Sequence, residues 1–419
     1  MRTISLGELD AGSHKFAWDG KSDSGAQVAD GNYWMQVKAY SGTAAVDAAT
    51  LQAYGGVDHP QFADRLKRFV TRIPAKERGA TGDPARLALV PETQCCAFLE
   101  QGLCAIHRDL GEDYLSNVCA TFPRHARDLA GQLEYALDLA CPEAARKALL
   151  PEDALELIES PVTLRPLALA KPLSPGRLTP LQVNEVRGFC CQLMLVGDLL
   201  PWQRLVLVGH LCHQLDLLIE ERAPLDIEAF LGDVVRQVES GSMLEKLASS
   251  TRDTGKQAQL FFKLWQGQAE RRNSPAQELI QQAVATGLGV DSIKTERPDW
   301  EVVIRRYGAG LKRANDALEH APSLLNNYLL NEMFREMFPF GAASPYRHFL
   351  GLIARFGLLR LMLAGVCNAS GKADAAMLVR TAQVCSRLYP HPSFSTKAVQ
   401  ALSVLGFDQP QRFAELLRT

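Results

Sequence analysis

Residues 95–124 read C-C-A-F-L-E-Q-G-L-C-A-I-H-R-D-L-G-E-D-Y-L-S-N-V-C-A-T-F-P-R, and residues 140–146 read A-C-P-E-A-A-R. The segment 95–141 therefore holds half of the chain's 10 cysteines: Cys95, Cys96, Cys104, Cys119 and Cys141. Thiolates are soft ligands, and four that converge suit zinc or an iron–sulfur cluster better than a hard cation. The density of cysteines predicts a metal or cluster site with Cys96, Cys104, Cys119 and Cys141 as ligands, and Cys95 as a substitute.

The spacing of these cysteines leaves a second interpretation open. The pattern C-x7-C-x14-C-x21-C lacks the C-x2-C pairs of zinc ribbons and ferredoxins. Free cysteine is also among the most buried residue types, so the same thiols are explained equally well as core residues. A folded domain would have to bring the four sulfurs together.

Composition narrows the class of protein. The chain has 419 residues, enough for two or three domains, and a formal net charge of −2. Such a balanced charge favours neither nucleic acid nor an acidic membrane surface as a partner. The N-terminus lacks a hydrophobic signal, and the apolar run 349–366 is interrupted by Arg355 and Arg360, which predicts a buried helix rather than membrane insertion. Clustered thiols without an export signal predict a cytoplasmic protein. No sequence feature sets an oligomeric state.

The first segment, 1–57, differs from the rest of the chain. Short alternating apolar runs are separated by D-G and S-G turn signals, which predicts a small antiparallel β segment. Residues 58–159 are expected to form a cysteine-rich α+β module. It begins with a helix over 59–73, and it pairs a strand at 133–139 with one at 87–90. Residues 104–110 and 114–119 read as short helical turns.

A proline-rich stretch separates this module from a helical region. Residues 160–180 contain Pro161, Pro166, Pro172, Pro175 and Pro180, and proline at that density excludes one regular element. Beyond it, 181–419 shows helical periodicity nearly throughout, including 226–239, 299–318 and an antiparallel pair over 324–338 and 346–366. The predicted fold is mainly α: a β segment, a cysteine-rich module, a linker and a C-terminal helical bundle.

One predicted helix carries a polar stripe. Asn327, Asn331 and Arg335 recur every fourth residue and so share a helix face. That face either lines a substrate or cofactor pocket or is exposed to solvent. The two interpretations are equally compatible with the sequence.

The amino-acid sequence around the cysteines resembles that of the flagellin lysine-N-methylase family of bacteria. The resemblance is carried by residues 96–124 and 140–146, and it continues through N-N-Y-L-L-N-E-M-F-R-E-M-F-P-F at 326–340, covering about 51–419. It implies methyl transfer from S-adenosylmethionine to lysine side chains of flagellin, with a 4Fe–4S iron–sulfur cluster. S-adenosylmethionine enters through the resemblance only, since neither a Rossmann fingerprint nor a C-x3-C-x2-C motif is present.

A lysine amine must be deprotonated before it attacks a methyl group, so a nearby carboxylate or a low-dielectric pocket should help. Glu112, Asp113 and Tyr114 lie beside the cysteines in the sequence and are the candidate catalytic residues.

The N-terminal segment departs from this family. W-D-G-x4-G-x4-D-G-x-Y, starting at Trp18, resembles the immunoglobulin-like part of the flagellar hook-assembly (hook-capping) protein. Family members usually begin with their own cysteine-rich stretch, whereas no cysteine precedes Cys95 here. The alternative function is therefore non-catalytic: a flagellar binding or scaffold protein stabilised by zinc or an iron–sulfur cluster, or a degenerate methylase.

Overall fold

The computed structural model describes residues 45–78, 82–90, 95–101, 103–129, 132–156, 169–170, 176–197, 199–221, 225–241, 245, 251–267, 275–389 and 392–418. The chain divides into two compact units, Met1–Ala120 and Thr121–Thr419. The predicted module 58–159 thus has residues on both sides of this division. The predicted β segment at 1–57 lies within the described ranges only from residue 45, and there the β prediction is wrong for Ala48–Gly55, because that stretch is a helix. Most of the predicted linker at 160–180 lies outside the described ranges.

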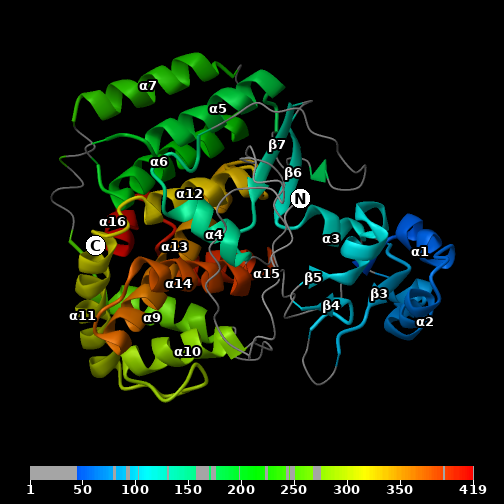
Figure 1. Cartoon of the computed structure of the whole chain (residues 1–419). Coiled ribbons are helices and arrows are strands. Elements are labelled where there is room, and N and C mark those ends of the chain that lie inside the picture. The colour runs from blue at the N-terminus through cyan, green and yellow to red at the C-terminus, as the bar shows by residue number, and fades with distance from the viewer. Residues whose placement is uncertain are drawn as a thin grey trace, which may run out of the picture. The chain divides into compact units, whose positions relative to one another are not determined.

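The first unit combines two helices with a small sheet (Figure 1). Strand β1 (Ala45–Val46) leads into α1 (Ala48–Gly55), and α2 (Pro60–Phe69) runs directly into β2 (Val70–Arg72). Strand β3 (Ala85–Leu87) lies between β1 and β2 and pairs antiparallel with both. The helix predicted over 59–73 is therefore confirmed up to residue 69. Apolar residues of these elements bury a core of their own: Val46, Phe62, Leu66, Leu87, Phe98 and Ile106.

Short turns carry the cysteine segment. Cys96 forms an isolated bridge with Leu89, and β4 (Leu99–Glu100) pairs antiparallel with β5 (Leu103–Cys104). A π-helical turn η2 (Ile106–Leu110), a 3₁₀ turn η3 (Glu112–Tyr114) and α3 (Asn117–Thr121) follow. A 3₁₀ turn, η1 (Ala75–Glu77), lies earlier in the unit. The helical turn predicted over 104–110 is confirmed from residue 106 onward, since Cys104 lies in β5, and the turn predicted over 114–119 is divided between η3 and α3.

The second unit begins with a hairpin. Strands β6 (Arg124–Leu129) and β7 (Gln132–Leu137) pair antiparallel, with His125 opposite Ala136, and β8 (Leu169–Ala170) pairs parallel with β6. The strand predicted at 133–139 exists, but its predicted partner at 87–90 is wrong. The correct partner, R-H-A-R-D-L, consists mostly of charged and polar residues and lacks the β-branched residues typical of strands.

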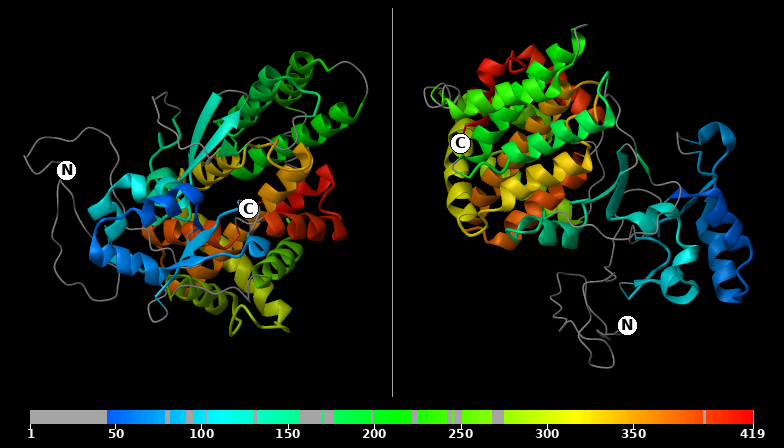
Figure 2. Two further views of the ribbon diagram at one scale, coloured as in Figure 1. Left: turned by 90° about the vertical axis from the view of Figure 1, so that its right-hand side faces the viewer. Right: turned by 90° about the horizontal axis from the view of Figure 1, so that it is seen from above.

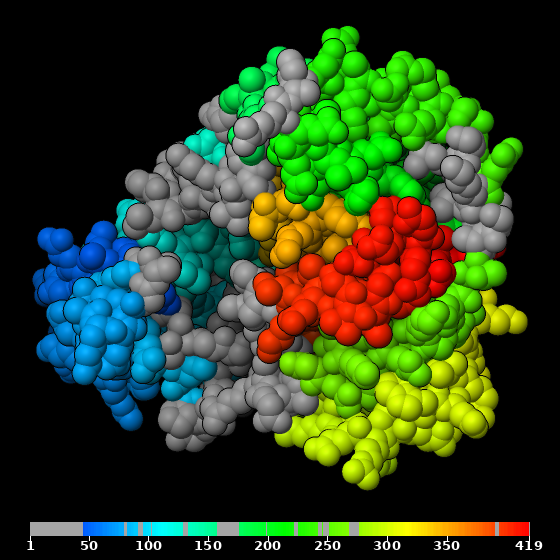
Figure 3. Space-filling model, turned by 180° about the vertical axis from the view of Figure 1, so that it is seen from behind, coloured from blue at the N-terminus to red at the C-terminus, as the bar shows by residue number. Residues whose placement is uncertain are grey.

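The rest of the second unit is helical, as predicted (Figures 1 and 2). In chain order the elements are α4 (Pro142–Leu149), α5 (Pro180–Leu193), α6 (Pro201–Glu220), α7 (Ile227–Glu239), α9 (Thr254–Gln266), α10 (Pro275–Leu288), α11 (Trp300–Leu318), α12 (Leu324–Arg335), α13 (Pro345–Ser370), α14 (Ala375–Leu388), α15 (Pro392–Val404), η4 (Pro410–Arg412) and α16 (Phe413–Leu417). Figure 3 shows the C-terminal residues, coloured red, on the surface of this unit beside green segments.

Helix α13 is the centre of this bundle, with other helices on all sides in Figure 1. Residues Phe349 to Cys367 are all buried, which confirms the predicted buried helix. By length and composition α13 would pass as a membrane span, yet its most apolar stretch is entirely enclosed by the protein. A helix that is apolar all round belongs in such a core. Two arginines interrupt it: Arg360 donates to the carbonyl oxygen of Leu417, 2.7 Å away, and Arg355 is described below.

Glycines let α10 and α11 approach the backbone of α13. A Cβ atom on Gly287 of α10 would lie 1.8 Å from the carbonyl oxygen of Gly365, and one on Gly310 of α11 would lie 2.4 Å from that of Ala364. Gly287→Ala should therefore force the two helices apart and lower the free energy of unfolding by about 1–3 kcal/mol. Urea unfolding followed by tryptophan fluorescence measures the change.

The matched control is Gly188→Ala in α5. Gly188 is helical and exposed, and a Cβ atom there would meet nothing within 4 Å. Because alanine restricts the unfolded chain and favours helix, this change should raise stability by roughly 0.5–1 kcal/mol. Equal effects of the two substitutions would contradict the close helix approach.

Candidate functional site

Three of the predicted ligand cysteines gather in the first unit. Cys96 comes from the bridge to Leu89, Cys104 from β5 and Cys119 from α3. Their thiols influence one another electrostatically, Cys119 with both Cys96 and Cys104, and Cys96 with Cys104. The turns between β4 and α3 thus bring Cys96 and Cys119, which are 23 positions apart in the sequence, near each other.

Burial controls the protonation of these thiols. It raises the pKa of Cys96 and Cys104 above the ordinary value of 9.0, and it raises the pKa of Cys119 to about 11, although Cys119 as a whole residue is exposed. Backbone N–H groups of Phe98 and His107 act in the opposite direction on Cys96 and Cys104, because they favour the thiolate. The thiols are therefore protonated at neutral pH, and a soft metal that bound them would release those protons.

Positive charge lies next to the same thiols. Arg65 of α2 lowers the pKa of Cys96 and Cys104, although less than burial raises it. The Nε–H of Arg65 donates a hydrogen bond to the carbonyl oxygen of Ala97, with 3.0 Å between the two atoms. The guanidinium of Arg65 also forms an ion pair with Glu100. A fixed cation beside thiols favours their deprotonated, ligand-competent form.

Tyr54 of α1 completes this thiol cluster. Its ring is buried, with 7% of the residue exposed, and its hydroxyl has no hydrogen-bond partner among the described residues. Burial raises the pKa of the Tyr54 hydroxyl, and negative charge at Cys119, Cys104 or Cys96 raises it further. The hydroxyl therefore lies within electrostatic reach of all three thiols.

The fourth predicted ligand belongs to the second unit. Cys141 is buried at the N-cap of α4, where burial raises its pKa and the backbone N–H groups of Ala144 and Glu143 lower it. Across the described parts of the chain, no group of three or more His, Cys, Asp or Glu side chains is arranged to hold a metal ion. Thiols are the donor type that a soft metal prefers, but Cys96, Cys104 and Cys119 are not arranged as a metal-binding group in this structure. The four-cysteine ligand set stays a prediction.

The candidate catalytic residues form η3. Glu112 and Asp113 are exposed, and Tyr114 is half-buried against the core of the first unit. η3 precedes α3, so the two carboxylates lie a few residues before Cys119 in the chain. Their catalytic role stays a prediction.

The polar stripe of α12 is buried, so the solvent-exposed interpretation is wrong. Asn327 donates to the carbonyl oxygen of Pro151 at 2.8 Å, and Asn331 donates to that of Leu137 at 3.0 Å. These amides hold α12 against β7 and the end of α4. Their role in cofactor binding, with that of Arg335, stays a prediction.

Arg335 belongs to a buried ion network between α12 and α13. Its guanidinium binds both oxygens of Glu332, at 3.2 and 2.9 Å, and lies 2.6 Å from Glu336. Arg355 of α13 lies 3.8 Å from Glu332 and 3.7 Å from Glu336, and its Nε has no partner among the described residues. Arg127 of β6 donates to the carbonyl oxygen of Arg335 at 3.1 Å, which ties the hairpin to the network.

His348 lies at the edge of this ion network. Its Nδ1 accepts from the backbone N–H of Gly341 at 3.2 Å. Burial, together with the charge of Arg355, lowers the pKa of His348 to about 4. The imidazole is therefore neutral at neutral pH.

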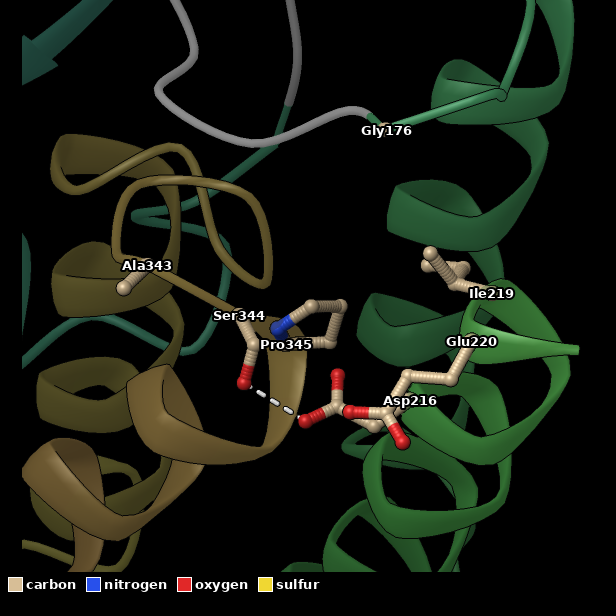
Figure 4. Close-up of a pocket in the computed structure, with 7 residues that line it drawn as sticks. All are labelled: Gly176, Asp216, Ile219, Glu220, Ala343, Ser344 and Pro345. Atoms are coloured by element: carbon tan, nitrogen blue, oxygen red, sulfur yellow. Dashed lines mark hydrogen bonds between the residues drawn. The ribbon is translucent and has the colours of Figure 1, made fainter.

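A small pocket of about 200 Å³ opens between the end of α6 and the start of α13 (Figure 4). Its lining consists of Gly176, Asp216, Ile219, Glu220, Ala343, Ser344 and Pro345. Asp216 accepts from the Ser344 hydroxyl at 2.5 Å and from the Tyr346 backbone N–H at 3.3 Å. Burial raises the pKa of Asp216. Because these bonds satisfy the first turn of α13, they explain Asp216 as a helix-capping residue.

Comparisons with known proteins find similarity mainly in the helical second unit. Residues 187–415, more than half of the chain, match the FliB lysine N-methylase C-terminal domain. The lysine-N-methylase of Salmonella typhimurium is 21% identical over 287 residues, which are 67% of this chain and 69% of that protein. The flagellar biosynthetic protein FliU of Salmonella muenchen is 35% identical over 65 residues, 15% of this chain and 38% of that protein.

A lysine N-methylase domain thus accounts for the helical bundle built around α13. The chain belongs to the FliB lysine N-methylase C-terminal domain family. Residues 1–43 match the FlgD Ig-like domain. The basal-body rod modification protein FlgD of Salmonella typhimurium is 42% identical over 52 residues, 12% of this chain and 22% of that protein. No solved structure matches the chain.

Sequence reasoning missed four residues of these sites: Tyr54, Glu332, Arg355 and His348. Glu332 and Arg335 show the i, i+3 spacing of an ion pair, which was a usable signal. Arg355 inside an apolar helix was another, because a buried guanidinium requires carboxylate partners. Tyr54 has no comparable sequence signal.

Proposed function

We propose that the chain transfers methyl groups from S-adenosylmethionine to lysine side chains of flagellin, in the cytoplasm, with an iron–sulfur cluster held by its cysteines. The observation that carries the proposal is the family membership over 187–415. The relative's printed name, lysine-N-methylase, supplies the reaction class. The thiol cluster around Tyr54 supports the cluster part of the proposal, since three soft ligands gather there.

In the proposed reaction the neutral lysine amine attacks a methyl carbon bound to a sulfonium sulfur. A carbon–nitrogen bond forms, the carbon–sulfur bond breaks, and the methylated ammonium loses a proton. S-adenosylmethionine supplies the electrophilic methyl group. The chain has to take up the proton and keep the amine neutral. Glu112 and Asp113 are the proposed proton acceptors because they are carboxylates next to the cysteine segment and face solvent.

Cys96, Cys104, Cys119 and Cys141 are the residues that would hold a 4Fe–4S cluster. Such clusters are bound by four thiolates. Backbone N–H groups and Arg65 beside the first two stabilise the deprotonated form that binding requires.

The alternative is a non-catalytic flagellar protein, either a metal-stabilised scaffold or a degenerate methylase. The match of residues 1–43 to the FlgD Ig-like domain favours this alternative.

The test combines composition with activity. The full chain is purified without oxygen, and iron, sulfide and visible absorbance are measured; the proposal expects bound iron and sulfide with an absorbance that bleaches on reduction. Flagellin and labelled S-adenosylmethionine then report methyl transfer to lysine. Cys119→Ser should remove iron and sulfide, whereas Cys191→Ser, at a partly buried thiol of α5, should retain them. A loaded chain without transfer would favour the scaffold, and a colourless chain that binds zinc would remove the cluster.

A further inference from the structure

A histidine and an aspartate form a hydrogen-bonded pair on the hairpin that opens the second unit. His125 of β6 lies opposite Ala136 of β7, and Asp138 follows two positions after Ala136 in the chain. Diagonal neighbours of this kind share one face of a hairpin and are within reach of long side chains. The Nε2 atom of His125 accordingly lies 2.9 Å from Oδ2 of Asp138. The register of the hairpin thus creates the pair.

The carboxylate of Asp138 is held in one orientation. Its Oδ1 atom accepts from the backbone N–H of Ala140 at 2.9 Å, and its own backbone N–H donates to the carbonyl oxygen of Pro123 at 2.7 Å. Burial raises the pKa of Asp138, but the hydrogen bond with His125 and the charge of Arg335 outweigh burial and lower that pKa below the ordinary value of 3.8. The carboxylate is therefore charged at neutral pH.

This geometry fixes the tautomer of His125. A charged carboxylate only accepts hydrogen bonds, so Nε2 of the neutral imidazole carries the hydrogen and Nδ1 carries the lone pair. Among the described residues Nδ1 has no hydrogen-bond partner. The histidine side chain is 32% exposed, against 16% for that of Asp138. An accessible imidazole oriented by a mostly buried carboxylate is the arrangement that accepts a proton from the nucleophile in Ser-His-Asp enzymes.

A protonated lysine is a substrate group that such a base fits. An ammonium nitrogen has no lone pair with which to attack a methyl carbon, so a base must act before transfer. Imidazole is the side-chain base used most often for this task near neutral pH. This first deprotonation is distinct from the later proton loss of the methylated ammonium, for which Glu112 and Asp113 are proposed.

We propose that His125 is the general base that deprotonates the substrate lysine before methyl transfer, with Asp138 as its positioning residue. A nitrogen–hydrogen bond of the lysine ammonium breaks, its electron pair stays on the amine, and the proton bonds to Nδ1 of His125. The charge of Asp138 stabilises the imidazolium, which later releases the proton to solvent. The inference rests on the proposed function in the reaction class, lysine methylation, and it does not depend on the iron–sulfur cluster.

The first test measures methyl transfer by the full chain with flagellin and labelled S-adenosylmethionine. In His125→Gln the amide nitrogen can still donate to Asp138, whereas the basic nitrogen is lost. General-base catalysis contributes roughly 10²–10⁴-fold, so this variant should transfer methyl groups at least about 100-fold more slowly, with the same metal content as the unchanged chain. In His125→Ala, added imidazole should restore transfer, which a purely structural role of the histidine does not predict. His320→Gln, at an exposed position after α11, should retain the original rate.

The second test measures contact with the substrate without methyl transfer. Diethyl pyrocarbonate modifies accessible, unprotonated imidazoles, and mass spectrometry locates the modified residues. Excess flagellin should protect His125 and leave His320 reactive. If His125→Gln transferred methyl groups as fast as the unchanged chain, or if flagellin did not slow the modification of His125, the inference would be overturned and the lysine methylase function would stand. An unchanged chain that transfers no methyl group would overturn the proposed function and this inference with it.

Discussion

Glu332→Gln should lower the free energy of unfolding by about 3–5 kcal/mol, because breaking a buried ion pair from one side leaves its partner charge uncompensated. Glu332 is 1% exposed, and its carboxylate binds Arg335 with two hydrogen bonds and lies 3.8 Å from Arg355. Glutamine keeps the size of the side chain and removes the charge. In this variant, Glu336 is the one carboxylate among the described residues of the network that still neutralises Arg335 and Arg355.

Urea unfolding measures this loss, with the buried Trp202 and Trp265 of the same unit as fluorescence reporters. Asp233→Asn is the matched control. Asp233 forms an i, i+3 ion pair with Arg236, but its side chain is 62% exposed, so the change should cost at most about 1 kcal/mol. If Glu332→Gln were as mild as this control, the network would not contribute to the stability of the bundle.

Acid should destabilise the second unit already between pH 7 and pH 5. The folded protein holds the pKa of His348 at about 4, against 6.5 for an ordinary histidine. Between these values the unfolded chain binds a proton that the folded chain excludes, so stability falls as the pH falls. The loss through this group is about 2 kcal/mol from pH 7 to pH 5 and about 3 kcal/mol by pH 4. The pH dependence from this histidine fades as the pH rises past 6.5, because the unfolded chain then also holds it neutral.

The variant His348→Asn isolates this contribution. An asparagine oxygen can accept the bond that the Gly341 N–H now donates to Nδ1, and asparagine does not titrate. Free energies of unfolding at pH 7, 6 and 5 should therefore change less in this variant than in the unchanged chain. His320→Asn, at an exposed position, should retain the original slope. An unchanged slope in His348→Asn would assign the acid sensitivity to other groups.

Long periodic helices were predictable from the sequence, whereas short strands were not. The helix predicted over 346–366 is α13 at Pro345–Ser370, and the one predicted over 226–239 is α7, capped by the Asp226 side chain. Their apolar spacing, caps and length agree. Strand β6 was not predicted because its sequence is highly charged and lacks β-branched residues, although its partner β7 follows directly in the chain.

The candidate site was predictable in its residue types and not in its contacts. The clustering of Cys96, Cys104 and Cys119 followed from their density in the chain. The burial of Asn327 and Asn331 did not, because it depends on carbonyl oxygens of Leu137 and Pro151 that a helical pattern does not contain. The sequence of a polar stripe is the same whether its side chains hydrogen-bond to water or to backbone groups from distant parts of the chain.

The arginines of α13 have a further consequence during biosynthesis. As the nascent chain leaves the ribosome, this segment has the length and apolar character that insertion machinery selects for lipid. Arg355 and Arg360 lie near its middle, and a guanidinium at the centre of a bilayer costs about 2.5–3.5 kcal/mol in such selection. In the folded bundle the same guanidiniums meet carboxylates and carbonyl oxygens. The free-energy cost of the two guanidiniums therefore opposes membrane insertion of this segment, whereas the folded bundle supplies them with polar partners.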